Sequence, residues 1–101
     1  MIKVQMIETR SLDEHQVIIK ADGHAGFDIP GKDIVCAAVS ILLEHTTQNL
    51  TSCRVADNGL NYNATVSCVN DGDKRLLRAL GNTLATLAHQ YPDNLSFTAK
   101  G

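Results

Sequence analysis

The sequence predicts an α+β domain in which a four-stranded, mostly antiparallel sheet packs against two helices, in the order β-β-α-β-α-β. Three observations predict this class. Four short segments alternate apolar and polar side chains, one longer segment is apolar almost throughout, and another repeats apolar side chains at helical spacing. With 101 residues, of which 44% are hydrophobic and 20% charged, the chain is expected to form a single domain over residues 1–101.

The strands are predicted from their two-residue period. Residues 2–7 and 16–22 alternate in this way, and the polar segment 9–14 between them predicts a hairpin loop. Residues 61–68 follow a turn signal and alternate strictly, and residues 95–99 predict a short final strand.

The two helices have recognisable starts. Asp33 is a candidate N-cap, because its carboxylate can accept hydrogen bonds from the unpaired first amides of a helix. Ile34–Leu43 contains a single polar side chain, Ser40, so this helix is expected to be buried on more than one side, with a second subunit as one possible cover. After a turn at residues 70–73, a second helix is predicted from an apolar stripe that ends before Pro92: Leu76, Leu77, Leu80, Leu84, Leu87, Ala88 and Tyr91.

Charge and composition exclude several classes of function. Nine Lys and Arg against eleven Asp and Glu give a formal charge of −2, which argues against a nucleic-acid partner. The sequence has no run of eighteen apolar residues and no signal-peptide pattern, so we expect a cytoplasmic protein without membrane association. Its three cysteines are an odd number and are expected to be thiols.

Cys36 and His24 are the candidate catalytic pair. If Asp33 is the N-cap, Cys36 is the third helical residue, where unpaired amides and the helix dipole favour a thiolate and could stabilise an oxyanion. The imidazole of His24 could take the thiol proton and return it to a leaving amine. Ser40 lies one turn deeper on the face of Cys36, and Asp33 could orient His24 or only cap the helix.

Other interpretations of the cysteines remain open. A cysteine in an apolar helix is commonly an inert core side chain, and the chain would then be a non-catalytic, dimeric protein-binding module. A redox sensor at Cys36 would need Cys53 or Cys68 as a resolving thiol. The cysteines lack a C-x-x-C spacing, so no metal site is predicted, and the Cys/His chemistry needs no cofactor.

Two motifs flank the glycine-rich loop. The first is Gly23-His24-Ala25-Gly26, and the second is Gly31-Lys32-Asp33-Ile34-Val35-Cys36-Ala37-Ala38-Val39-Ser40. Together they resemble the signature of the Prp family, the ribosomal-processing cysteine proteases. The length of the chain and the order of its predicted elements also fit that family.

The resemblance implies a homodimeric, cytosolic endopeptidase that removes a short N-terminal extension from a large-subunit ribosomal protein precursor. It assigns the nucleophile to Cys36 and the general base to His24, with Asp33 and Ser40 in supporting positions. The polar segment 44–49 departs from the family pattern and leaves a second candidate, a prophage-borne relative that processes a virion precursor.

The loop between the two motifs is expected to be mobile and to cover the site. Gly26 and Gly31 are the points where its backbone could swing, so that the loop admits a peptide and then excludes water. The resemblance implies an aromatic substrate residue before the cut, and Phe27 and Ile29 are expected to form part of its pocket.

Overall fold

The computed structural model describes residues 1–24, 26, 28–29, 33–67 and 69–101. In this part of the chain, five strands and two helices follow the order β-β-α-β-β-α-β. Their bounds are β1 Ile2–Arg10, β2 His15–Asp22, α1 Ile34–Gln48, β3 Cys53–Asp57, β4 Asn61–Val66, α2 Asp71–Gln90 and β5 Leu95–Lys100.

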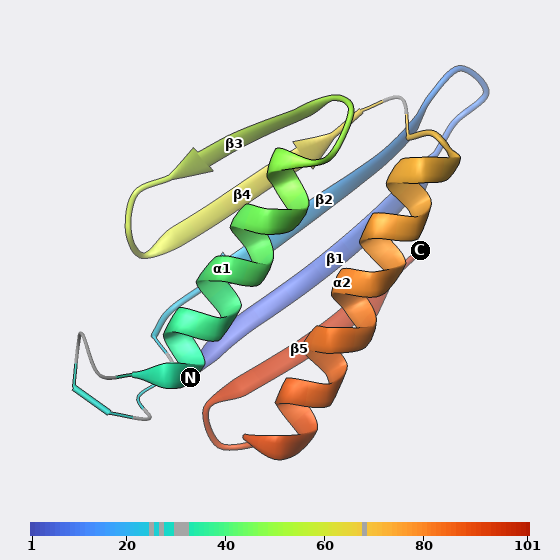
Figure 1. The fold of residues 1–101 in the computed structure, drawn as a ribbon. Helices are drawn as coiled ribbons and strands as arrows, with labels where there is room; N and C mark the ends of the chain where they lie inside the picture. Colours follow the sequence, from blue (N-terminus) through green and yellow to red (C-terminus); the bar gives the residue numbers. More distant parts are fainter. Residues whose placement is uncertain (25, 27, 30–32, 68) are drawn as a thin grey trace.

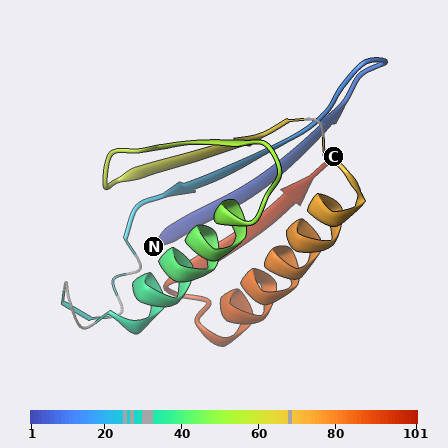
Figure 2. The ribbon, with the colours of Figure 1, turned by 45° about the horizontal axis from the view of Figure 1, so that its top comes forward.

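The strands form one sheet in the order β3-β4-β2-β1-β5. β5 is parallel to β1, whereas the other three neighbouring pairs are antiparallel. Both helices lie on the same face of this sheet, side by side (Figures 1 and 2). The predicted α+β class and the mostly antiparallel sheet are therefore confirmed.

The sheet has five strands where the sequence predicted four. The additional strand, β3, lies in the polar segment between α1 and β4 and forms an edge of the sheet. Residues 54–57 are all exposed, so β3 lacks the apolar alternation by which a half-buried strand is recognised. The turn predicted before β4 is confirmed, because Asp57 and Asn58 accept hydrogen bonds from the amides of residues 59–61.

The hydrophobic core lies between the sheet and the two helices. Alternate residues of the central strands face the helices, as their two-residue period requires. The core residues from the strands are Ile2, Val4, Val17, Ile19, Ala21, Ala64, Val66 and Leu95. The helices contribute Val35, Val39, Leu43, Leu77, Leu80 and Leu84.

Helix α1 is longer than the apolar run that predicted it. It continues beyond Leu43 to Gln48, and in this last part Thr46 is buried while Glu44 and His45 are exposed. Within the run, Val35, Val39 and Leu43 are buried, but Ile34 and Ile41 are exposed, so this chain covers one face of the helix and not several as expected. No helix in the described part of the chain is both long and apolar enough to cross a membrane.

A buried carboxylate, Asp73, joins α2 to the segment after α1. Its side chain is 1% exposed and accepts hydrogen bonds from the amide and the hydroxyl of Thr51, both at 3.0 Å. It also accepts from the amide of Asn70, whose own side chain accepts from the Asp73 amide and completes a capping box. Burial raises the pKa of the Asp73 carboxyl, but these hydrogen bonds outweigh burial and hold its pKa below the usual value.

Replacing Asp73 with alanine is expected to lower the free energy of unfolding by about 2–4 kcal/mol at pH 7. The variant leaves the amides of Thr51 and Asn70 without their acceptor and removes half of the capping box. Urea denaturation followed by circular dichroism would measure the change. Asp71→Ala is the matched control, because the fully exposed Asp71 lies in the same helical turn, and a comparable loss in that variant would contradict the assignment.

The same carboxylate makes the free energy of unfolding depend on pH. Because the folded state lowers the pKa of Asp73, its contribution is complete above the pKa of the unfolded chain, about 3.9. The contribution is lost as the pH falls through the lower folded-state pKa. The stability difference between the parent protein and Asp73→Asn is therefore expected to shrink below about pH 4, and a constant difference would contradict this linkage.

Candidate active site

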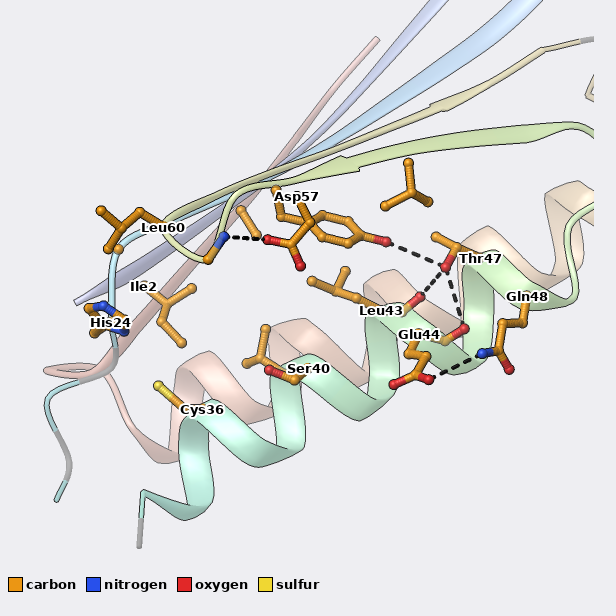
Figure 3. Close-up of a pocket in the computed structure, with 16 residues that line it drawn as sticks. Ile2, His24, Cys36, Ser40, Leu43, Glu44, Thr47, Gln48, Asp57 and Leu60 are labelled. Atoms are coloured by element: carbon orange, nitrogen blue, oxygen red, sulfur yellow. Dashed lines mark hydrogen bonds between the residues drawn. The ribbon is translucent and has the colours of Figure 1, made fainter. Parts of the chain in front are cut away.

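A groove of about 600 Å³ runs along α1 on the side of the β3–β4 hairpin (Figure 3). One wall is the face of α1, and the opposite wall comes from β3 and the turn that follows it. Described residues that line it are Ile2, Ala21, Gly23, His24, Cys36, Val39, Ser40, Leu43, Glu44, Thr47, Gln48, Val55, Asp57, Gly59, Leu60 and Tyr62.

The N-cap of α1 places Cys36 at one end of the groove. Oδ1 of Asp33 accepts hydrogen bonds from the amides of Val35, at 3.0 Å, and Cys36, at 2.9 Å, so the predicted N-cap is confirmed. Cys36 is consequently the third residue of α1, and its side chain is partly exposed to the groove. Valines at positions 35 and 39 anchor this part of the helix in the core.

The same cap already uses two of the backbone amides that could bind an oxyanion. The amides of Val35 and Cys36 donate to the Asp33 side chain, and the amide of Ala37 donates to the Asp33 carbonyl at 3.1 Å. These are helix-start amides that the sequence suggested as oxyanion donors. The cap bonds of Val35 or Cys36 would have to break before either amide could serve an oxyanion.

His24 is placed by the tight connection at the end of β2. Gly23 has a φ of 90°, and a Cβ at this position would come 2.6 Å from the carbonyl oxygen of Met1. Its amide donates to the carbonyl of Leu60, which ties the end of β2 to the β3–β4 turn. Only glycine fits this close approach without strain, and the chain then leaves the sheet with His24 exposed at the groove.

The structure brings three of the four predicted site side chains to the same groove. Figure 3 shows Cys36 and His24 at the same end, with the sulfur directed to the side where His24 lies. Ser40 lines the groove one helical turn after Cys36. Asp33 is the N-cap beneath Cys36 and is not among the residues that line the groove.

Two of the four loop residues expected to cover the site, Phe27 and Gly31, lie outside the described residues. Gly26 is exposed, with a φ of 67° that favours glycine. Ile29 is 61% exposed, and its amide donates to the Asp28 carboxylate. The expected movement of this loop and its contribution to a substrate pocket stay predictions.

Sequence reasoning missed much of the wall opposite Cys36. Val55, Asp57 and Leu60 come from β3 and its turn, a segment without an apolar period. Glu44 belongs to the part of α1 beyond the predicted apolar run. The turn motif at residues 57–59 was a usable signal for the hairpin, but nothing local indicated that it would face α1.

Cys53 lies outside the groove. It is half-buried in β3 and lines a separate depression with residues such as Gln16 and Thr65. Burial raises the pKa of the Cys53 thiol, and the negative charge of Asp73 raises it further. The thiolate form of Cys53 is thereby disfavoured, which makes it a poor partner for a redox reaction at Cys36; Cys68 lies outside the described residues.

The family is decided by a comparison of the whole sequence. The family model described as "Cysteine protease Prp" matches residues 1–96. The chain belongs to the Prp family of cysteine proteases. Prp proteins hydrolyse peptide bonds, and this chain is accordingly a peptide-bond hydrolase by family. No curated protein sequence shows a significant match to it.

Solved structures agree with the Prp assignment. The ribosomal processing protease Prp of Staphylococcus aureus, crystallised with a covalently linked product peptide, is 28% identical with a TM-score of 0.79, over 99% of this chain and 100% of that one. The same enzyme with a substrate peptide is 27% identical with a TM-score of 0.72 and the same coverage. SMU.848 of Streptococcus mutans, at 24% identity and a TM-score of 0.74, covers 100% of this chain and 96% of its own and shares the fold.

Proposed function

We propose that the protein is a cysteine endopeptidase in which His24 removes the thiol proton of Cys36. The thiolate attacks the scissile carbonyl, the imidazolium returns its proton to the leaving amine, and water then releases the acyl group from sulfur. Ser40 supplies a hydroxyl within the site, and Asp33 fixes the helix turn that carries Cys36. This chemistry uses side chains of the protein alone.

One observation carries the proposal: a helix-start cysteine and an exposed histidine share one end of a groove large enough for several peptide residues. The two side chains come from segments separated by the glycine-rich loop, so the fold has to bring them together. A non-catalytic binding module would not require this pairing. Membership of a cysteine protease family supports the catalytic interpretation.

We propose as substrate a large-subunit ribosomal protein precursor with a short N-terminal extension. The support comes from the S. aureus relative, a ribosomal processing protease crystallised once with a product peptide and once with a substrate peptide. Such a precursor is made in the cytosol, and we place the enzyme there as well.

The test is incubation of the precursor with the protein and with its Cys36→Ser variant, followed by N-terminal sequencing of the product. One new N-terminus, formed by the parent protein and not by the variant, is the expected result. A virion precursor serves as the competing substrate, and cleavage of that protein alone would overturn the ribosomal assignment. Binding of the precursor without cleavage would favour the non-catalytic module.

A homodimer completes the proposal. Ile34 and Ile41 lie two helical turns apart on α1, and both are more than half exposed, at 55% and 61%. Exposed apolar side chains at this spacing are typical of a surface that packs against another subunit. Sedimentation equilibrium is expected to give twice the monomer mass of 10.9 kDa, and a monomer at micromolar concentration would contradict the dimer.

A further inference from the structure

The charged side chains of the groove beyond Cys36 are all acidic among the described residues. Apart from the titratable His24, the described residues lining it include two ionisable carboxylates, Glu44 and Asp57, and no lysine or arginine. The remaining surface is largely apolar, with Leu43 and Val39 on the α1 side and Tyr62 from β4. A bound peptide would therefore meet an apolar groove with a carboxylate on each of two opposite walls.

The two carboxylates come from opposite walls. Glu44 is on α1, and its Oε1 accepts a hydrogen bond of 3.1 Å from Nε2 of Gln48. Asp57 ends β3, and its Oδ1 accepts a hydrogen bond of 2.8 Å from the amide of Gly59 (Figure 3). These bonds hold each carboxylate in place, and a carboxylate with about four acceptor positions keeps capacity for a further donor.

Tyr62 from β4 lines the same groove as the two carboxylates. Its hydroxyl donates to Oγ1 of Thr47, on α1, at 3.4 Å, so this hydrogen bond joins β4 to the helix across the groove. Burial raises the pKa of Tyr62, and the hydrogen bond with Thr47 lowers it by a smaller amount. The charges of Cys53, Asp57 and Glu44 raise the pKa of Tyr62 further.

The distance from Cys36 to Glu44 along α1 predicts which substrate residue lies beside Glu44. Glu44 follows Cys36 by eight residues, which corresponds to about 12 Å along a helix. An extended peptide advances about 3.3 Å per residue, so this distance spans about four peptide residues. A lysine or arginine side chain about four residues from the scissile bond would bring its charge to Glu44, with Asp57 on the opposite wall of the same groove.

We propose that Glu44 and Asp57 are specificity-determining residues that select substrates with a lysine or arginine about four residues from the cleaved bond. The inference rests on the proposed protease function and extends it to the class of peptide that the groove accepts. The carboxylates attract a cationic side chain and repel an acidic one, so they discriminate between substrates without taking part in bond cleavage.

The test compares three peptides that carry the cleavage sequence and differ at one position. Lysine, glutamine or glutamate is placed four residues before the cut in one series and four residues after it in a second, and kcat/KM is measured for each. The lysine peptide of one series is expected to be cleaved about three- to tenfold faster than its glutamine counterpart, with the glutamate peptide slowest. This preference is expected to shrink when the salt concentration is raised from 0.05 to about 0.5 M.

The double variant Glu44→Gln, Asp57→Asn is expected to abolish the preference, so that the lysine and glutamine peptides are cleaved with about the same kcat/KM. Both replacements keep the oxygen that accepts the local hydrogen bond, so the groove retains its shape. Glu14→Gln is the matched control, because Glu14 is an exposed acid in the β1–β2 loop and does not line the groove. A double variant that still prefers lysine would overturn the proposal.

A measurement of peptide binding tests the proposed charge preference independently of the proposed protease function. Fluorescence anisotropy with the Cys36→Ser variant measures the affinity for the same peptides when no bond is cleaved. A lysine preference in binding that the two groove substitutions remove would support the proposal even if the parent protein cleaved none of them. Cleavage that depends on Cys36 but shows no charge preference would overturn the proposal and leave the protease function standing.

Discussion

Replacing Cys36 with serine is expected to lower kcat/KM for the ribosomal precursor by at least three orders of magnitude, roughly 10³- to 10⁶-fold. The serine hydroxyl remains protonated near neutral pH and is a much weaker nucleophile than a thiolate. We expect that the helix start and the imidazole of His24 do not compensate for this difference. Cleavage would be measured by mass spectrometry of the precursor over time.

Cys53→Ser is the matched control for this variant. Cys53 is also a partly buried cysteine, but it lies in β3 outside the groove, and its thiol has a raised pKa because of burial. We expect this variant to cleave the precursor at nearly the parent rate. Equal cleavage by Cys36→Ser and the parent protein would eliminate Cys36 as the nucleophile, whereas loss of activity in both cysteine variants would indicate a structural effect.

Replacing His24 with alanine is expected to lower kcat/KM by about 10²- to 10⁴-fold, the usual contribution of a general acid–base side chain. The variant keeps Cys36 and the groove but removes the group that we propose exchanges a proton with the thiol and the leaving amine. Steady-state cleavage of a peptide that carries the precursor's cleavage sequence would measure the change. His89→Ala is the control, because His89 is an exposed histidine in the last turn of α2 and does not line the groove.

Chemical rescue distinguishes a proton-transfer role from a structural one. His24 is exposed at the end of the groove, so an imidazole molecule in solution can reach the space that its side chain leaves. Added imidazole is expected to restore part of the activity of His24→Ala and to leave Cys36→Ser inactive. An inactive His24→Ala variant that imidazole does not rescue would point to a positioning role for this residue.

Signals carried by neighbouring residues were sufficient for most elements. Asp33 followed by an apolar run predicted the start of α1, and the structure has the Asp33 side chain bonded to two amides of that turn. The apolar stripe from Leu76 to Tyr91 predicted α2, because helix periodicity depends on side chains three or four positions apart. The alternation that predicted β1, β2 and β4 likewise acts between near neighbours.

Other features depended on contacts between distant segments. β3 is an exposed edge strand, so its identity as a strand comes from pairing with β4 and not from its own pattern. Asp73 belonged to a polar turn in the sequence, yet Thr51, twenty-two residues earlier, makes it a buried acceptor. Neither feature leaves a periodic signal in the chain.

For the site, the sequence by itself determined the candidate side chains and the position of Cys36 in the first turn of a helix. Only the tertiary structure decided that His24 shares the end of one groove with Cys36, and that Glu44 and Asp57 face that groove from opposite walls. The physical reason is the sequence separation over which each kind of interaction acts. Capping and periodicity act over a few residues, whereas the walls of a groove are set by how a helix and a hairpin pack on the same sheet.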